Sequence, residues 1–237
     1  MKDGYARIDG LLDARAVAAL RRAVEIALAA PPVPGCEREH NRLAPLRWHD
    51  DAVDLVLRDR ARCEAIAAAA GGDDLRWISG YVTAKDPGSE ALDWHRDWWC
   101  WDHPVSRRPA AAQIAVVVYL TATDERSGAL RVVPGSHLGR SGSEVTLSAR
   151  PGDAVVIDYR LLHGTHPNAA ATRRDAVLLS FTPSWRGLPG DVRGHLIQHL
   201  ALPGDDEAVP LGGWHERLLP RFDGERVDLP LSLVAPH

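Results

Sequence analysis

A series of short, β-branched segments between Arg76 and Thr182 limits the folds open to this chain. The most apolar, residues 113–121 (QIAVVVYLT), is almost continuously apolar, which is typical of a strand buried on both faces. Segments of the same kind, separated by turns rich in Gly, Pro and Asp, lie at 77–83, 129–133, 144–147, 154–158 and 174–182. Several short strands at this spacing predict a β-sandwich or barrel.

Helical patterns precede these strands. Asp13 can cap a helix that runs to about Ala30, and Asp51 a second one to about Ala70, where Gly71-Gly72 ends it. Together the patterns predict a mainly β fold, a jelly roll or cupin-like double-stranded β-helix, packed against an N-terminal helical layer. We expect one domain over residues 1–237, with helices in 13–70, a core over about 76–183 and a tail over 184–237.

Composition excludes several classes of partner. The net charge is −4 and no basic block stands out, so we expect no nucleic-acid partner. The N-terminus lacks an apolar signal-peptide core, and no apolar run approaches the length of a membrane span.

The three cysteines are odd in number and widely spaced, which predicts reduced thiols in a cytoplasmic protein. We expect a small-molecule substrate.

Metal-binding side chains occur in Trp94-His95-Arg96-Asp97. On an extended strand, residues i and i+2 point to the same face, so His95 and Asp97 can reach one metal ion. A second histidine from elsewhere would complete a two-His, one-carboxylate set, which leaves open positions on iron and is diagnostic of non-haem Fe(II) oxygenases. His163 and His166 both follow a predicted strand, and their spacing does not choose between them. Without further evidence, His95 and Asp97 would be an exposed pair on a strand edge.

Four stretches taken in order resemble the phytanoyl-CoA dioxygenase family of Fe(II)- and 2-oxoglutarate-dependent oxygenases. The resemblance covers roughly residues 3–183, and two departures are Ser127 in place of Asn before Gly128 and Thr165 in place of Ser. Residues 36–50 and the tail after Pro183 have no match, and we expect them to carry substrate selectivity. The matching stretches are 3–12 (DGYARIDGLL), 85–97 (KDPGSEALDWHRD), 120–137 (LTATDERSGALRVVPGSH) and 151–174 (PGDAVVIDYRLLHGTHPNAAATRR).

The resemblance selects the third ligand. The family pattern of His, Gly, a hydroxyl residue and then Asn matches His163 with Asn168, and it makes His163 the ligand beside His95 and Asp97. His166 then becomes a loop residue. His137, at the end of the Pro-Gly-Ser-His turn, becomes structural.

An arginine is needed for the co-substrate, because the distal carboxylate of 2-oxoglutarate requires a fixed cation and a guanidinium can bind it bidentately. The resemblance assigns this role to Arg174, which opens a predicted strand. We expect Thr165, by resemblance, and Ser180, which shares the strand face of Arg174, to add hydroxyl contacts. The adjacent Arg173 should face the other way and be a solvated charge.

A tryptophan cluster follows the proposed metal-binding strand. Trp98, Trp99 and Trp101 could form an aromatic wall of a substrate pocket, or they could pack against the helical layer or a subunit interface. Cys100 lies among them without an evident base and is expected to be a packing residue.

The resemblance implies a dioxygenase that uses Fe(II), 2-oxoglutarate and O2, with ascorbate as reductant in vitro, and releases succinate and CO2. Halogenating relatives replace the carboxylate ligand with a small residue, so Asp97 favours hydroxylation of an unactivated C–H, although desaturation, epoxidation or ring formation use the same ligands. Competing classes are a metal-binding jelly roll without turnover and a zinc hydrolase, which would not need Arg174. The high Ala, Arg and Gly content favours a tailoring hydroxylase of secondary metabolism.

Overall fold

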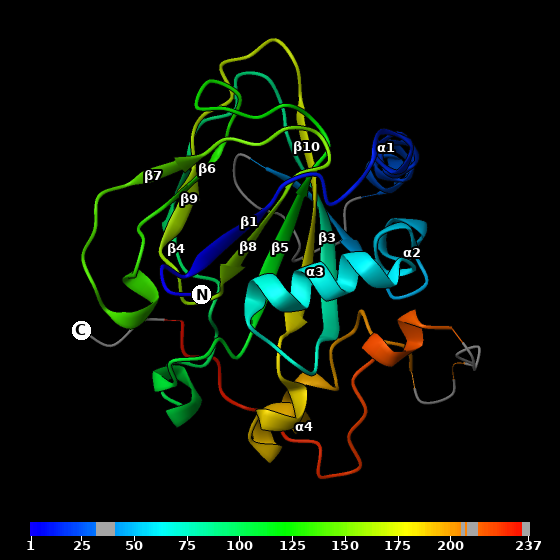
Figure 1. The fold of residues 1–237 in the computed structure, drawn as a ribbon, viewed down its shortest axis with the longest axis vertical. Helices are drawn as coiled ribbons and strands as arrows, with labels where there is room; N and C mark the ends of the chain where they lie inside the picture. The colour runs from blue at the N-terminus through cyan, green and yellow to red at the C-terminus, as the bar shows by residue number, and fades with distance from the viewer. Residues whose placement is uncertain (32–40, 205–206, 208–212, 234–237) are drawn as a thin grey trace.

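The computed structural model describes residues 1–31, 41–204, 207 and 213–233. Two antiparallel sheets form its centre, with helices on one side (Figure 1). The larger sheet has the order β1-β8-β5-β10-β3-β2, and its strands are Tyr5–Ile8, Ala154–Asp158, Ile114–Tyr119, Arg174–Thr182, Arg76–Lys85 and Arg42–Leu46. The smaller sheet has the order β4-β9-β6-β7, with strands Leu92–His95, His163–Thr165, Leu130–Val132 and Val145–Leu147.

The larger sheet is buried on both faces. In β5, Val116 and Val118 contribute to the hydrophobic cluster beneath the helices, whereas Ala115, Val117 and Tyr119 contribute to the cluster between the two sheets. Because successive side chains of a strand point to opposite faces, a strand covered on both sides must be apolar throughout. This explains the uninterrupted run at 113–121 and agrees with the predicted jelly-roll class.

The helical layer differs from the prediction at one point. Helix α1 (Ala14–Ala29) begins as expected, with the Asp13 side chain accepting a hydrogen bond from the Ala16 backbone N–H at 2.7 Å. The single helix expected over 51–70 is instead two helices, α2 (Asp51–Leu57) and α3 (Arg60–Ala70). Asp59 interrupts it, because its side chain accepts from the Ala61 N–H and starts a new helix.

Local sequence patterns did not predict three short strands. Strand β2 lies in residues 41–50, which the sequence pattern left irregular, and β9 holds His163 in a strand and not in a turn. Strand β1 pairs with β8 and was expected only by resemblance. Residues 36–40 of the segment expected to carry selectivity, together with Cys36, lie outside the described residues.

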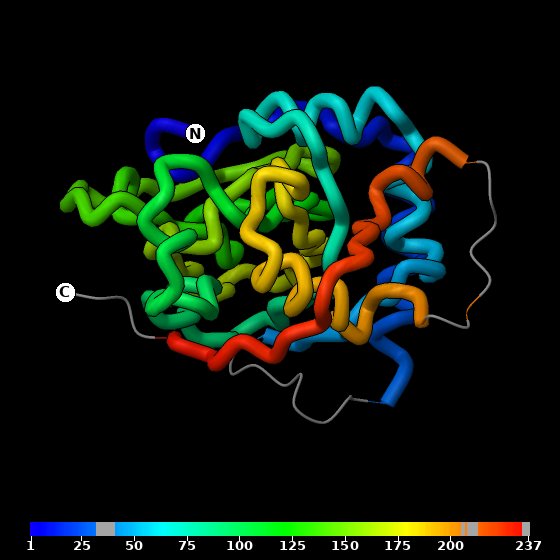
Figure 2. Tube along the Cα trace, turned by 90° about the horizontal axis from the view of Figure 1, so that it is seen from below, coloured from blue at the N-terminus to red at the C-terminus, as the bar shows by residue number. Residues whose placement is uncertain are grey.

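The C-terminal segment contains more regular structure than its composition indicated. It includes helix α4 (Gly190–Leu196) and the 3-10 helices η3 (Trp185–Gly187) and η4 (His215–Leu218); two further 3-10 helices, η1 (Pro104–Arg107) and η2 (Ser136–Leu138), lie in the core. Figure 2 shows the segment running across one end of the molecule, where Ser232 N–H donates to the Trp99 carbonyl at 2.8 Å. Among the described residues, no helix is long and apolar enough to span a membrane.

Candidate metal centre

His95, Asp97 and His163 converge between the ends of β4 and β9. The two histidines are paired in register across these strands, and their ring centroids lie 4.2 Å apart. Asp97 lies between them, with one carboxylate oxygen 3.6 Å from His95 Nε2 and the other 3.5 Å from His163 Nε2. One ligand atom from each residue lies within 4.8 Å of the others, and no other such trio occurs among the described residues.

Both imidazoles are oriented by backbone carbonyls. His95 Nδ1 lies 2.7 Å from the Asp93 carbonyl, and His163 Nδ1 lies 2.9 Å from the Leu161 carbonyl. A carbonyl can only accept, so each Nδ1 carries the proton and each Nε2 presents its lone pair to the centre. Two imidazole nitrogens and a carboxylate therefore face one point, which is the donor set that suits ferrous iron.

The expected single strand carrying both ligands is only partly correct. Strand β4 ends at His95, and Asp97 lies in the irregular segment that follows. Its position depends on Tyr159, whose carbonyl accepts hydrogen bonds from the Asp97 N–H at 3.0 Å and the Trp98 N–H at 2.9 Å. The carboxylate is thus fixed by a residue that follows β8, not by continued strand pairing.

The other candidate histidines lie elsewhere. His166 Nε2 is 2.8 Å from Thr146 Oγ1 and 3.7 Å from Glu144, at the edge of the smaller sheet. His137 is 5% exposed on η2, and a Cβ added at Gly4 would lie 2.6 Å from its Nδ1. Neither belongs to the cluster of His95, Asp97 and His163.

Arg174 is buried at the start of β10, on the face that packs between the two sheets. Its side chain is 4% exposed, and its Nε has no hydrogen-bond partner among the described residues. Burial lowers the pKa of Arg174, while the nearby Tyr119 and Asp175 act to raise it. A buried guanidinium nitrogen without an acceptor is costly, and a bound carboxylate would satisfy it.

Lys85 is a residue of this region that sequence analysis did not select. It lies opposite Arg174 in the pairing of β10 with β3, is fully buried, and donates a hydrogen bond to the Glu90 carbonyl. Burial, and then the charge of Arg174, lower the pKa of Lys85 to about 8. The signal available in the sequence was a lysine close after the strand expected at 77–83.

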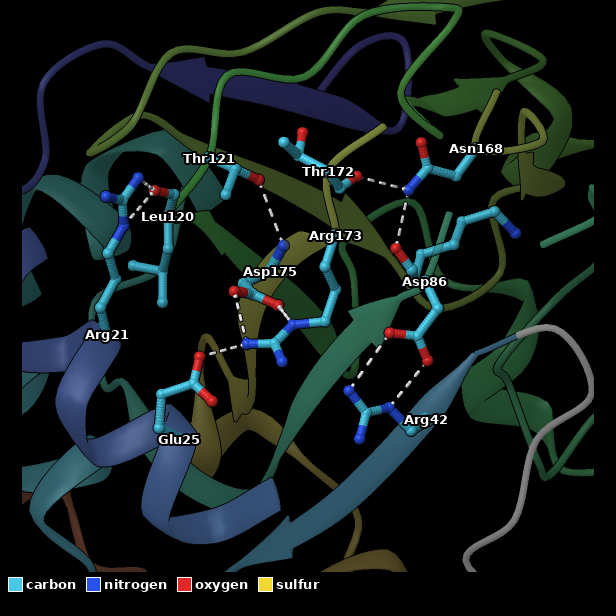
Figure 3. Close-up of polar contacts among 11 residues, drawn as sticks. Arg21, Glu25, Arg42, Asp86, Leu120, Thr121, Asn168, Thr172, Arg173 and Asp175 are labelled. Carbon is cyan, nitrogen blue, oxygen red and sulfur yellow. Dashed lines mark hydrogen bonds and ion pairs between the residues drawn. The ribbon is translucent and has the colours of Figure 1, made fainter. Parts of the chain in front are cut away.

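Arg173 is not the solvated charge that we expected. It forms a bidentate ion pair with Asp175, at 2.5 and 3.0 Å, and a second ion pair with Glu25 of α1 (Figure 3). Asn168 supports the same loop by donating to the carbonyls of Lys85 and Thr172. These contacts hold Arg173 on the helical side of β10, so the next side chain, Arg174, points to the opposite face.

The two hydroxyl residues have different surroundings. Thr165 is buried on β9, two residues after His163 and on the same strand face, and its Oγ1 accepts from the Leu92 N–H at 3.4 Å. Ser180 Oγ accepts from Gln113 Nε2 at 2.7 Å, and Gln113 Oε1 accepts from Trp99 Nε1 at 2.9 Å. Ser180 is therefore already engaged by a side chain that the sequence analysis did not select.

The tryptophans divide into two groups. Trp98 and Trp101 are buried, 1% and 8% exposed, in a cluster with Ile78 and with Trp185 of the C-terminal segment. They pack as the second alternative expected, but against the C-terminal segment and not against the N-terminal helical layer. Trp99 is half-buried and stacks on His195 of α4 with ring centroids 4.4 Å apart. Of the three tryptophans, Trp99 is the one whose indole N–H donates to Gln113, the side chain that also bonds Ser180 of β10. Cys100 is a buried free cysteine within the same cluster.

Comparison with known proteins identifies the family. The phytanoyl-CoA dioxygenase family model matches residues 1–176. The chain belongs to the phytanoyl-CoA dioxygenase family. It is thus a non-haem iron, 2-oxoglutarate-dependent dioxygenase, as the sequence motifs predicted.

Curated relatives of this phytanoyl-CoA dioxygenase family member carry names of the same enzyme class. A probable alpha-ketoglutarate-dependent hypophosphite dioxygenase from Stutzerimonas stutzeri is 22% identical over 78% of the chain and 68% of the relative. The iron/alpha-ketoglutarate-dependent dioxygenase ausU from Aspergillus calidoustus is 29% identical over 63% of the chain and 53% of the relative. The chain thus spans about half to two thirds of the length of these curated relatives.

Solved structures share the fold of this family member. The epimerase SnoN, in complex with Fe3+, alpha ketoglutarate and nogalamycin RO, aligns with a TM-score of 0.63 and 20% identity over 76% of the chain and 79% of its own length. HygX from Streptomyces hygroscopicus, with nickel, 2-oxoglutarate and hygromycin B bound, aligns with a TM-score of 0.60 and 18% identity over 77% of the chain and 84% of its own length. Both likenesses confirm the predicted double-stranded β-helix.

Proposed function

We propose that this dioxygenase hydroxylates an unactivated C–H bond of a small molecule, an intermediate of secondary metabolism, with release of succinate and CO2. The observation that carries the proposal is the cluster in which two imidazole Nε2 atoms and the Asp97 carboxylate face one point. When bound there, ferrous iron with 2-oxoglutarate and O2 supplies an oxidant strong enough for such a bond. The protein supplies orientation and exclusion of side reactions.

His95, Asp97 and His163 are the proposed iron ligands. Their backbone-fixed side chains offer three donors on one side, which leaves the other coordination positions for co-substrate and dioxygen. The carboxylate of Asp97 occupies the position at which a halogenating enzyme would need room for chloride. Its presence supports hydroxylation over halogen transfer.

Arg174 is the proposed anchor for the distal carboxylate of 2-oxoglutarate. Its burial, and its Nε without an acceptor among the described residues, support this role. Thr165 shares the strand face of His163 and would add a hydroxyl contact. Ser180 Oγ accepts a hydrogen bond from Gln113. Because a hydroxyl that accepts can also donate, Ser180 would add the second hydroxyl contact.

Small natural products are the proposed substrate class, and Trp99 is the proposed aromatic wall. Among the proteins of similar fold, SnoN is described with nogalamycin RO bound and HygX with hygromycin B bound. Trp99 is half-buried beside the C-terminal segment, whereas Trp98 and Trp101 lie in the packed cluster.

A second candidate reaction, other than hydroxylation, uses the same site. SnoK is described as a carbocyclase and SnoN as an epimerase, so proteins of this fold direct the same kind of oxidant to ring closure or stereochemical inversion. Desaturation, epoxidation or ring formation therefore stand as alternatives to hydroxylation. A metal-binding protein without turnover is the alternative of another class.

Succinate formation from 2-oxoglutarate tests the proposal. Iron-loaded protein with ascorbate should form succinate slowly without a prime substrate, and His163→Ala should abolish this turnover while His166→Ala should retain it. Candidate natural products that accelerate succinate formation would then be analysed by mass spectrometry. A gain of one oxygen supports hydroxylation or, for a substrate with a C=C bond, epoxidation, whereas a loss of two hydrogens supports desaturation or ring closure.

Anaerobic titration separates the remaining classes. Fe(II) and 2-oxoglutarate together should produce the visible charge-transfer band of a chelated keto acid. Absence of both the band and succinate formation would contradict the dioxygenase assignment of this site. A band without any turnover across the substrate panel would favour the metal-binding alternative.

A further inference from the structure

A cavity of about 930 Å³ lies between helix α3, the start of strand β3 and the C-terminal segment. Its walls come from α3, residues 72–76, η3, α4 and residues 213–221. Figure 2 shows the orange part of the C-terminal segment beside the connection from α3 to β3. His95, Asp97 and His163 do not line it, so it is separate from the proposed metal site.

Five arginines line this cavity, contributed by four separate segments of the chain. They are Arg76, Arg186, Arg193, Arg217 and Arg221. Asp74 neutralises part of this charge, because its nearly buried carboxylate lies 2.6 Å from Arg76 and 3.0 Å from Arg186. One carboxylate shared by two guanidinium groups leaves a net positive charge at this wall.

Two of the other three carboxylates around the cavity contact partners other than these five arginines. Glu64 lies 2.7 Å from Arg60, and Asp73 accepts a hydrogen bond from Ser184 Oγ at 2.9 Å. The remaining one, Glu216, is almost buried, 9% exposed on η4. Among the described residues, Arg193, Arg217 and Arg221 form no ion pair with a carboxylate.

Two of these three arginines lie over aromatic rings. The Arg193 guanidinium lies 4.6 Å from the centre of the Phe222 ring, and that of Arg217 lies 6.0 Å from the centre of the Trp214 ring. Arg193 Nε is buried and has no hydrogen-bond acceptor among the described residues. A buried donor without an acceptor costs free energy that a bound anion would recover.

We propose that this cavity binds a small organic phosphate. A phosphate group carries about 1.5 to 2 negative charges at pH 7 and three acceptor oxygens, and it matches guanidinium groups bidentately. The volume greatly exceeds one phosphate group, and the indole rings of Trp185 and Trp214 in the walls suit an apolar body attached to it. The concave shape favours a small molecule over a flat protein surface. This proposal does not depend on the proposed oxygenase reaction.

Calorimetric titration of the full chain with phenyl phosphate tests the proposal. We expect saturable binding at one site, weakened at least tenfold in Arg193→Gln and in Arg217→Gln. Arg22→Gln is the matched control, because Arg22 is an exposed arginine of α1 that does not line the cavity. Arg217 is exposed, so its variant keeps the test valid if Arg193→Gln fails to fold.

Three results with the wild type and the arginine variants would overturn the proposal. They are the absence of saturable binding to the wild type, an equal loss of affinity in Arg22→Gln, and unchanged affinity in Arg217→Gln. The His163→Ala variant should bind phenyl phosphate as tightly as the wild type. Loss of binding in that variant, or displacement by 2-oxoglutarate, would put the anion at the metal centre and would also contradict the proposal.

Discussion

His163 lies directly opposite His95 in the pairing of β9 with β4, and a backbone carbonyl fixes the Nδ1 proton of each ring. The two Nε2 atoms therefore face the Asp97 carboxylate. Four predictions follow from the contacts around this centre and from the packing of the fold.

Removal of the third ligand should abolish metal binding. We expect His163→Ala to weaken Fe(II) binding by more than ~100-fold, because loss of residues that merely support a ligand already costs about 10- to 100-fold. His166→Ala is the control, since its ring contacts Thr146 and Glu144 instead. Anaerobic Fe(II) titration measures both. Equal losses in the two variants would mean that the assignment of the third ligand is wrong.

Removal of the buried guanidinium should weaken co-substrate binding and not metal binding. Hydrogen bonds to a charged group contribute about 1.5–3 kcal/mol, so Arg174→Gln should raise the Kd of 2-oxoglutarate roughly 10- to 100-fold. Arg173→Gln is the neighbouring control, because its contacts are with Asp175 and Glu25. The charge-transfer band measured against 2-oxoglutarate concentration reports the Kd. An unchanged Kd in Arg174→Gln would exclude this residue as the anchor.

Acidification should destabilise the fold through His137. Burial lowers the pKa of His137 below its ordinary value of 6.5; Asp158 opposes this shift, while Arg160, the N-terminal amine and Arg140 add to it. The unfolded chain therefore takes up a proton that the folded state resists, and stability falls as the pH drops below about 6.5.

Urea unfolding at about pH 7.5 and about pH 5.5 measures this effect. Neither ring nitrogen of His137 has a hydrogen-bond partner among the described residues, so His137→Leu removes the titration without breaking a bond. The variant should lose less free energy of unfolding on acidification than the wild type. An equal or larger loss would show that other groups dominate the acid response.

Close backbone packing should make the fold less tolerant of an alanine at Gly152 than at Gly10. Its φ is +95°, and an added Cβ would lie 2.3 Å from the Leu12 carbonyl oxygen. Gly10 also has a positive φ, of +63°, but no atom lies within 4 Å of an added Cβ. Both alanine variants should lose about 1–2 kcal/mol for the left-handed backbone, and Gly152→Ala roughly 1–3 kcal/mol more for the overlap. Thermal or urea unfolding that ranks them equally would contradict the close contact.

Local patterns predicted those parts of the fold that neighbours in the sequence specify. Asp13 starts α1 because a cap needs only its own turn, and the strand expected at 174–182 has the bounds found for β10. The break between α2 and α3 was missed because Arg58-Asp59 contains neither Gly nor Pro. Strand β9 was missed because three residues carry no periodicity, and its stability comes from partners on both sides.

The sequence by itself determined the fold class, the family and the types of residue that can hold a metal and a keto acid, since all of these depend on residue identity and local spacing. The family resemblance selected His163 from the sequence, and the tertiary structure shows how it reaches His95 and Asp97, through hydrogen bonding between strands remote in sequence. It also decided that Arg173 pairs with α1 and that Lys85 is buried opposite Arg174. Burial and long-range pairing arise only when separate segments pack together, and no local pattern encodes them.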